Sequence, residues 1–322
     1  MSNHNSVMTA LKSSLFELTT RIKHKKIIYV DYPMHHNIGD LLIYLGSMEL
    51  LKESGCEIIA QFTAANTSVE KIQKIIKDHN QEVSLVFHGG GNFGDIYKAH
   101  QDCRLLLIEY FNNLNTIVFP QTIFYQSDEK KNKDIKIFKN HKDLTIAVRD
   151  RKSAVLAEEF SDNVFLFPDT AHMLWPNYFQ EAEQSTESSG LLKLNRWDCE
   201  GNNAIGKQNF DWALMIKRSD NYLKAALNKI SARNPFLAID KLIAYLWLQH
   251  CKNICQRAAN YFNSFEQIET NRLHGHILSC LLSKNNIVLD NSYGKNFTYV
   301  EQWTKQSDLV EVQTTKVKPN EE

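Results

Sequence analysis

The sequence predicts an α/β protein with two Rossmann-like domains facing a central cleft, and three observations lead to this prediction. The chain has 322 residues, which is too long for one small hydrophobic core. Its composition, with 43% hydrophobic and 23% charged residues, is typical of a globular protein. From residue 27 onward, short apolar runs alternate with helix-like runs, a pattern typical of parallel sheets covered by helices on both faces.

Strands and helices alternate regularly through the first half of the chain. Strand-like apolar runs occupy residues 26–32, 57–62, 83–89, 115–121, 143–150 and 163–171. Helix-like runs occupy residues 40–55, 68–79, 102–114 and 151–160. In the first of these helices, Asp40 is expected to be the N-cap, and Gly55 follows the last turn. We therefore predict a Rossmann-like domain over residues 1–176.

A polar segment rich in Ser and Glu, residues 177–190, is predicted to be a linker. Beyond it, residues 191–322 are predicted to form a second, smaller α/β domain. Strand-like runs occupy residues 190–196, 266–270 and 285–295, and helix-like runs occupy residues 238–262, 272–283 and 297–306. Residues 201–235 fit neither pattern. Two facing α/β domains usually bind ligands at the carboxyl ends of their strands, so we expect the site there.

Charge and hydropathy exclude several classes of function. Lysine plus arginine and aspartate plus glutamate both number 37, so no net field favours nucleic acid or an anionic membrane, although local positive sites for anions stay possible. The N-terminus lacks the features of a signal peptide, and the longest apolar run, LIAYLWL, is far shorter than the ~20 residues of a membrane span. We expect a cytoplasmic protein without a transmembrane segment, and peripheral contact with the inner face of the membrane stays open. The apolar stripe within residues 7–22 is expected to pack on the protein itself.

The six cysteines are scattered along the chain, so we expect free thiols rather than a disulfide framework. Only Cys251 and Cys255 are close together, and His250 precedes them. Because no second pair of ligands lies nearby in the sequence, we expect ordinary helix residues here and no metal site.

The pattern Asn-x-Gly-Asp occurs twice, each time after a predicted strand. In the first copy, Asn37 is expected to hydrogen-bond a ligand, and Gly39 relieves the backbone. Asp40 either only caps the helix or also touches substrate. The second copy lies in HGGGNFGD, whose expected substrate-binding residues are His88, Gly90, Gly91, Asn92 and Asp95.

The same loop matches the pattern G-x-G-x-x-G, but it follows the third strand rather than the first. The stretch about twenty residues later, LNTIVFPQ, contains no acid, so the dinucleotide-binding fingerprint is incomplete. What remains is a glycine loop that could approach an anion or a sugar closely, or that only permits a tight turn.

Charged residues follow predicted strands in both domains. Arg149 and Asp169 do so in the first domain, and Arg272 does so in the second. On a helical wheel Arg272 and His276 fall on the polar side of the following helix, whereas His274 turns toward the apolar side. His274 would then be a buried structural residue unless the helix starts after it, and His276 would be the alternative acid–base group. The two arginines could hold a doubly anionic ligand across the cleft, or each could form an ordinary salt bridge.

Taken together, these pieces resemble the polysaccharide pyruvyltransferase family. The resemblance is carried, in the family's order and across roughly residues 30–300, by NIGDLLI, HGGGNFGD, RDRKSA, FPDTA, LNRWDCE, NRLHGHI and LDNSYGK. It implies a GT-B-like fold. The family's phosphoenolpyruvate-binding Arg and its Arg-Leu-His element match Arg149, Arg272 and His274, which are therefore the expected catalytic residues. Lys295 of the last motif joins Asp169 and His276 as an expected substrate-binding residue.

The resemblance also implies a reaction. The enolpyruvyl group of phosphoenolpyruvate would be transferred onto two hydroxyls of a sugar, giving a pyruvate ketal and phosphate in surface polysaccharide biosynthesis (exopolysaccharide, capsule or lipopolysaccharide). The first domain would bind the acceptor, free or lipid-linked, and the second would bind phosphoenolpyruvate as a co-substrate, with no cofactor. One histidine can act as general acid and then as general base. Two alternatives stay open: a GT-B glycosyltransferase that uses a nucleotide sugar, and a non-catalytic sugar-binding module.

Overall fold

The structure, a computed structural model, describes residues 3–179, 188–195, 210–232, 234–290 and 294–313. Contacts within the chain define two compact units. The larger unit consists of Leu11–Leu174 and Ile216–Asn253, and the smaller unit consists of Met1–Ala10, Trp175–Met215 and Ile254–Glu322.

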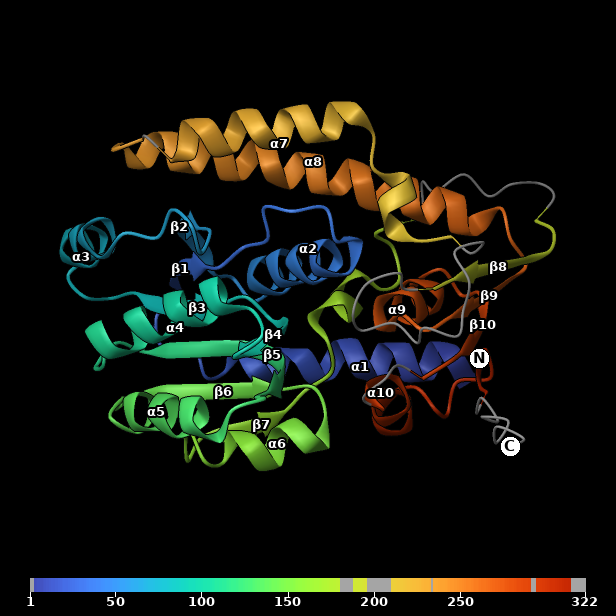
Figure 1. Cartoon of the computed structure of the whole chain (residues 1–322), viewed down its shortest axis with the longest axis horizontal. Coiled ribbons are helices and arrows are strands. Elements are labelled where there is room, and N and C mark those ends of the chain that lie inside the picture. Colours follow the sequence, from blue (N-terminus) through green and yellow to red (C-terminus); the bar gives the residue numbers. More distant parts are fainter. Residues whose placement is uncertain (1–2, 180–187, 196–209, 233, 291–293, 314–322) are drawn as a thin grey trace, which may run out of the picture. The chain divides into compact units, whose positions relative to one another are not determined.

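A parallel sheet forms the centre of the larger unit, with the strand order β2-β1-β3-β5-β6-β7 and with β4 paired to β5 (Figure 1). The strands are β1 (Lys26–Val30), β2 (Glu57–Phe62), β3 (Ser84–Phe87), β4 (Gly90–Gly94), β5 (Thr116–Phe124), β6 (Leu144–Val148) and β7 (Val164–Leu166). The chain winds from β1 to β2 on one side and then to β3 on the other. In sheets of this type, ligands bind where the winding direction reverses, here at the carboxyl ends of β1 and β3.

Helices connect these strands and extend the unit. They are α1 (Asn3–Thr19), α2 (Ile38–Glu53), α3 (Val69–Asp78), α4 (Lys98–Tyr110), α5 (Asp128–Lys139), α6 (Arg151–Ala157), the 3-10 helix η1 (Thr170–Leu174), α7 (Arg218–Ser231) and α8 (Leu237–Asn263). The unit boundaries fall within α1 and α8. The apolar stripe of α1 is buried, as predicted, at Met8, Leu11, Leu15 and Leu18. Cys251 and Cys255 are both fully buried in α8.

Several elements differ from their predicted form. The sequence patterns miss β4, which is rich in glycine, and α5, which is mostly charged and buries only Asp134 and Phe138. Gly94 is required in β4 because its φ is +131° and a Cβ would lie 1.7 Å from the Phe124 carbonyl oxygen. Helix α7 lies within residues 201–235, where no element was predicted.

The start of α2 corrects the prediction for the first Asn-x-Gly-Asp copy. The helix begins at Ile38, and Asn37 is its N-cap, with the side-chain oxygen accepting a hydrogen bond from the Gly39 amide at 3.0 Å. The prediction that Asp40 is the N-cap is wrong, because the Asn37 amide already satisfies that end of the helix. Asp40 lies instead in the first turn, where its negative charge still suits the helix dipole. Gly55 follows the helix with a positive φ of +69°, as predicted.

The smaller unit contains a second parallel sheet, with the order β11-β10-β9-β8. Its elements are β8 (Leu191–Leu194), the 3-10 helix η2 (Trp212–Met215), β9 (Gln267–Thr270), α9 (Leu273–Leu281), β10 (Asn285–Val288), α10 (Lys295–Trp303) and β11 (Val310–Val312). Helix α9 packs closely on the sheet, because a Cβ on Gly275 would lie 2.6 Å from side-chain atoms of both Leu194 and Thr270. Both units are therefore parallel α/β structures, which confirms the predicted Rossmann-like, GT-B-like fold class.

Two segments belong to a different unit than the predicted boundaries at 176 and 191 imply. Residues 216–253 join the larger unit, where the buried indole of Trp247 donates to the Pro33 carbonyl at 2.6 Å. The first ten residues join the smaller unit, where the His4 ring hydrogen-bonds the Cys280 carbonyl oxygen at 2.9 Å and the Ser307 hydroxyl at 2.8 Å. Such contacts between distant segments leave no periodic signal in the sequence. Within the described part of the chain, every helix is too short or too polar to cross a bilayer.

Candidate functional site

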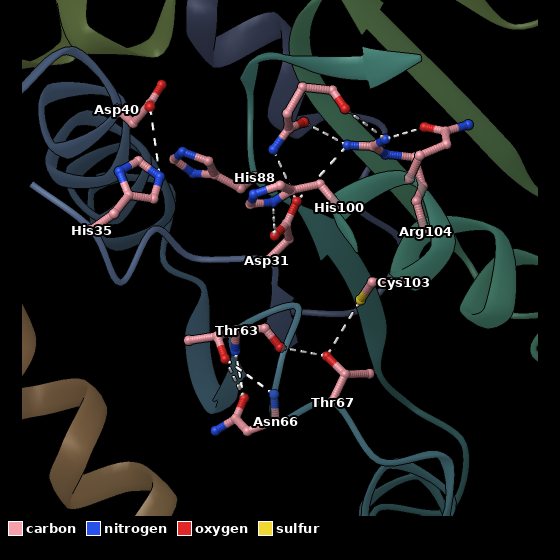
Figure 2. Close-up of polar contacts among 12 residues, drawn as sticks. Asp31, His35, Asp40, Thr63, Asn66, Thr67, His88, His100, Cys103 and Arg104 are labelled. Atoms are coloured by element: carbon pink, nitrogen blue, oxygen red, sulfur yellow. Dashed lines mark hydrogen bonds and ion pairs between the residues drawn. The ribbon is translucent and has the colours of Figure 1, made fainter. Parts of the chain in front are cut away.

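Polar side chains gather in the larger unit at the carboxyl ends of β1 and β3, where the winding of the sheet reverses (Figure 2). Asp31 follows β1 directly and is only 1% exposed. Its backbone has a φ of +68°, a left-handed conformation that aspartate tolerates better than most residues but that still stores strain. The turn aims the carboxylate at His100, on α4, and at Asn92, on β4.

Asp31 and His100 form a close buried pair. Asp31 Oδ1 lies 2.6 Å from His100 Nδ1, and Asp31 Oδ2 accepts a hydrogen bond from Asn92 Nδ2 at 3.0 Å (Figure 2). Burial alone would lower the pKa of His100, but the hydrogen bond and the charge of Asp31 outweigh it and raise the pKa above its usual value. The side chain of His100 keeps 26% of its surface exposed. An imidazole oriented by a buried carboxylate and open to solvent on one side can exchange protons with a bound molecule.

Arg104 fixes the position of Asn92, which in turn bonds Asp31. Its guanidinium is fully buried and donates to Asn92 Oδ1 at 2.7 Å and to Gln101 Oε1 at 2.5 Å. Gln121 Nε2 also donates to Asn92 Oδ1, at 3.0 Å. Because both donors fix the oxygen of Asn92, its amide nitrogen must point at Asp31. The guanidinium itself lies 3.9 Å from Asp31 Oδ2, so a positive charge faces the Asp31 side chain from within the core.

His88, which follows β3, is kept neutral. It is 2% exposed, and burial lowers its pKa to about 4. Its Nδ1 shares a hydrogen bond of 2.8 Å with the Tyr29 hydroxyl. Its Nε2 has no hydrogen-bond partner within the described residues. His88 lies between His35 and the Asp31–His100 pair in Figure 2, so it belongs to the same cluster.

The two copies of Asn-x-Gly-Asp contribute differently to this cluster. From the first copy, Asp40 contributes a partly exposed carboxylate 3.7 Å from His35 Nε2, and the Asn37 side chain caps α2. From the second copy, Asn92 belongs to the cluster, whereas Asp95 does not. The Asp95 carboxylate accepts hydrogen bonds from the backbone amides of residues 126 and 127, at 2.8 and 3.0 Å, and so fixes the start of α5.

The glycines of both copies lie beside this cluster. Gly39 is buried in the first turn of α2, and Gly91 is exposed on β4. A Cβ on Gly90 would lie 3.6 Å from Asp40 Oδ1, so the loop after β3 runs close to this carboxylate. The substrate-binding roles predicted for Asn37, Gly39, Gly90, Gly91 and Asp95 stay predictions.

Arg149 and Asp169 pair with each other. Arg149 follows β6, as predicted, and its Nη1 lies 2.6 Å from Asp169 Oδ2, with both side chains at most 2% exposed. Arg149 Nε also donates to the Thr122 hydroxyl at 2.9 Å. Arg149 therefore forms a salt bridge, which is the structural alternative predicted for it. Its role in binding an anion stays a prediction.

In the smaller unit, Arg272 is the N-cap of α9 and is held by Asp211. Arg272 Nη2 donates a hydrogen bond to Asp211 Oδ2 at 2.7 Å, and Arg272 Nε lies 2.6 Å from Asp211 Oδ1 in the same ion pair. Arg272 is 9% exposed and Asp211 is 5% exposed. This pairing fixes the plane of the guanidinium.

The histidines of α9 exchange the places predicted for them. His276 is fully buried, with Nδ1 2.7 Å from Asn286 Oδ1 and Nε2 2.9 Å from Thr304 Oγ1, and burial lowers its pKa to about 4. His274 lies in the first turn and is only partly buried. The prediction that His276 lies on a polar side is wrong, because almost every residue of α9 is buried and the helix has no such side. The Lys295 side chain lies outside the described residues.

The sequence patterns miss five residues of these two clusters: Asp31, His35, His100, Arg104 and Asp211. Asp31 was counted as part of the predicted strand 26–32, and His100 precedes the predicted helix 102–114. The position of Asp31 directly after the apolar run KIIYV is the one sequence signal that could have identified it. Asp211 follows residues 196–209, which lie outside the described part of the chain.

Comparisons with known proteins agree on one family. Residues 37–293 match the family model described as polysaccharide pyruvyl transferase. The chain is 34% identical over 303 residues to "Putative pyruvyl transferase EpsO" of Bacillus subtilis, covering 92% of this chain and 91% of that protein. It is 31% identical over 311 residues to "Pyruvyl transferase 1" of Schizosaccharomyces pombe, covering 91% of this chain and 74% of that protein.

A solved structure supports the fold alone. The crystal structure of a functionally uncharacterised protein from Klebsiella pneumoniae superposes with a TM-score of 0.58 at 19% identity. The match covers 98% of this chain and 100% of the other.

Proposed function

Because this chain belongs to the polysaccharide pyruvyl transferase family and is therefore an enzyme, we propose that it uses phosphoenolpyruvate to form a pyruvate ketal on a sugar. The acceptor would be a precursor of a surface polysaccharide, and the likeness to a protein named EpsO favours an exopolysaccharide. The observation that carries the proposal is the Asp31–His100 pair, which supplies an oriented acid–base group.

The proposed reaction balances without an oxidant or a reductant. A proton adds to the methylene carbon of phosphoenolpyruvate, which leaves a cationic centre at C2. One sugar hydroxyl attacks C2 and loses its proton, the C–O bond to phosphate breaks, and a second hydroxyl attacks the same carbon. The products are the ketal and phosphate, and the two hydroxyl protons end on the new methyl group and on phosphate. The expectation that no cofactor takes part follows from this chemistry and stays a prediction.

The larger unit supplies the acceptor side in this proposal. His100 removes the proton from the attacking hydroxyl, and Asp31 stabilises the imidazolium that forms, as a buried carboxylate does in acid–base pairs. His88 offers its unpartnered Nε2 to a sugar hydroxyl, and as a neutral ring it can donate or accept that bond. Asp40 and His35 supply further hydrogen-bonding groups at the edge of the cluster.

The smaller unit supplies the donor side. Arg272 carries the positive charge and the planar geometry that carboxylate and phosphate groups require, and Asp211 holds it in one orientation. His274 follows two residues later and is the proposed acid that protonates the methylene carbon. Its place in the first turn of α9 also puts it near backbone amides that favour a bound anion.

Phosphate release from phosphoenolpyruvate, measured against a panel of candidate sugar acceptors, tests the proposal. We expect release to require both an acceptor with two suitably placed hydroxyls and an intact His274. A matched panel with nucleotide sugars tests the glycosyltransferase alternative. Release of nucleoside diphosphate with no use of phosphoenolpyruvate would reject the proposed donor.

A further inference from the structure

The helical hairpin formed by α7 and the first half of α8 exposes several large apolar side chains. We call the outer side of this hairpin, residues 217–246, the hairpin surface. The two helices lie side by side, and Asp220 of α7 lies 3.7 Å from His250 of α8 (Figure 1). The large apolar side chains of this surface are 36–75% exposed, and they are Tyr222, Leu223, Ile230, Phe236, Leu242, Tyr245 and Leu246.

Helix α8 is apolar on both of its sides in this region. Its inner side is formed by Ile243, Ala244 and Trp247, each at most 2% exposed. Its outer side carries Leu242, Tyr245 and Leu246 at the i, i+3, i+4 spacing that normally marks the buried face of a helix. A solvent-facing stripe with this spacing indicates a surface that is covered by a partner.

The hairpin surface is also positively charged. Lys217, Arg218, Lys229 and Lys241 are exposed. The only acids in residues 217–246 are Asp220 and Asp240, and both are 3% exposed. Asp240 is neutralised by Lys71 at 2.6 Å, and Asp220 accepts a hydrogen bond from the Lys217 backbone amide at 2.7 Å. Within residues 217–246, therefore, no exposed acidic side chain offsets the exposed cations.

Hydrogen bonds attach the hairpin to the rest of the larger unit and so hold its two helices in place. The Lys71 ammonium also donates to the Asn234 carbonyl at 2.8 Å, and Asn66 Nδ2 donates to the Ser231 hydroxyl at 2.7 Å. The Trp247 indole is bonded to the loop after β1, as described above. These contacts hold the inner side of both helices and leave the outer side uncovered.

We propose that the hairpin surface docks this enzyme on an anionic lipid bilayer, with α7 and α8 lying in the plane of the interface. Aliphatic and aromatic side chains would enter the boundary between headgroups and acyl chains, and the lysines and arginine would contact lipid phosphates. This combination of a basic polar edge with Leu, Ile, Phe and Tyr is the one that interfacial helices use. The proposal concerns where in the cell the enzyme is bound. It does not depend on the identity of the donor or the acceptor.

Charge complementarity favours a bilayer over a second copy of this chain. A two-fold dimer through this face would bring its cations against the same cations of the other copy, without an exposed acid to pair with them. An anionic membrane supplies the missing negative charge. A second copy is therefore treated as an outcome of the test.

Vesicle co-sedimentation of the full chain tests the proposal. The probe is phosphatidylcholine vesicles with about one third phosphatidylglycerol, compared with pure phosphatidylcholine. One variant, Lys229→Gln with Lys241→Gln, removes two cations, and a second, Leu242→Ser with Tyr245→Ser, removes two exposed apolar groups. The matched control carries Lys136→Gln with Val155→Ser, which changes exposed residues of the same kinds on α5 and α6.

We expect binding to anionic vesicles that high salt abolishes, with little binding to neutral ones. The lysine variant should bind roughly 25-fold more weakly, since each basic residue near such a surface contributes roughly fivefold. The apolar variant should bind at least about tenfold more weakly than the parent. The control variant should bind as the parent does. Phosphate release with a water-soluble acceptor should be unchanged in all three variants.

Three outcomes would overturn the proposal. They are equal binding to neutral and anionic vesicles, equal binding by the hairpin and control variants, and a parent dimer in solution that the hairpin variants convert to monomer. Because activity with a soluble acceptor is measured in parallel, loss of docking is distinguished from failure of the proposed reaction.

Discussion

Replacement of Asp31 by Asn removes the charge of the Asp31–His100 pair and little else. Asparagine has nearly the same size, and it tolerates the left-handed backbone at this position, where φ is +68°. Its side-chain oxygen can still face His100 Nδ1, so the orientation of the ring can survive. The variant therefore isolates the negative charge, which is the feature that our account requires.

The stability cost of Asp31→Asn follows from burial. Asp31 is 1% exposed and faces His100 and Arg104, so the change leaves the fully buried guanidinium without its nearest negative charge. Loss of one partner from a fully buried pair costs about 3–5 kcal/mol, and the exposed part of His100 reduces that figure. We expect the free energy of unfolding to fall by about 2–3 kcal/mol. The pKa of His100 is higher in the folded protein than in the unfolded chain, where it is about 6.5. The resulting stabilisation is complete below pH 6.5 and is lost as the pH rises through the folded-state pKa. The loss of stability in the variant should therefore be larger below pH 6.5.

The catalytic effect is expected in the pH profile of kcat/KM for phosphate release. Without Asp31, burial dominates and the pKa of His100 falls below its usual value, so the acidic limb of the profile should move to lower pH. The plateau should drop by ~10²–10⁴, the usual contribution of a general base.

The matched control for this prediction is Asp134→Asn. It removes another buried carboxylate of the same unit, one that accepts hydrogen bonds from Gln101 and Tyr125 at 2.8 Å. We expect this control to lose stability without moving the acidic limb. An Asp31→Asn enzyme with an unchanged profile and plateau would refute the acid–base role of the pair.

The remaining predictions concern three other sites. His276→Ala should lower the free energy of unfolding by about 2–4 kcal/mol, measured by thermal and urea unfolding, because two buried hydrogen bonds are lost, whereas His274→Ala should fold normally and lose ~10²–10⁴ in turnover. The free energy of unfolding should fall as the pH drops from 6.5 toward 4, because in this range His88 and His276 bind protons only in the unfolded state. Each histidine should account for a loss of about 3 kcal/mol over this range. His88→Gln should therefore make the free energy of unfolding depend less on pH between 6.5 and 4. Arg272→Ala should weaken phosphoenolpyruvate binding by about 2–4 kcal/mol in a calorimetric titration and should also destabilise the fold, since Asp211 is left unpaired; unchanged affinity would remove Arg272 from the site.

The sequence predicted most of the fold because the strands of a parallel sheet are continuously apolar and therefore visible in one dimension. The predicted runs 26–32, 57–62 and 83–89 all contain parallel strands, β1, β2 and β3. Helix α5 was missed because its charged residues cover an edge of the unit and leave only two buried positions to mark it. The unit boundaries were missed for residues 216–253, because the contact of Trp247 with Pro33 joins positions far apart in the chain.

The candidate site was predicted less completely, for two physical reasons. The repeated Asn-x-Gly-Asp pattern drew attention to the ends of β1 and β3, but identical residues took different roles once packed: Asn37 caps a helix, whereas Asn92 orients a carboxylate. A helical wheel assumes one solvent-facing side, and α9 has none, so His276 was misplaced. Asp31 and His100 meet only in three dimensions, and no spacing rule links them.

The central claim is that the carbons of phosphoenolpyruvate pass to the acceptor as a ketal. It is tested most directly by incubating the enzyme and acceptor with phosphoenolpyruvate that carries a carbon label on its methylene group, followed by nuclear magnetic resonance of the purified sugar product. Our account predicts a labelled methyl signal on a quaternary ketal carbon joined to two sugar oxygens, formed in step with phosphate release. Phosphate release with all of the label recovered as free pyruvate, or an unlabelled product that forms only with a nucleotide sugar, would contradict it.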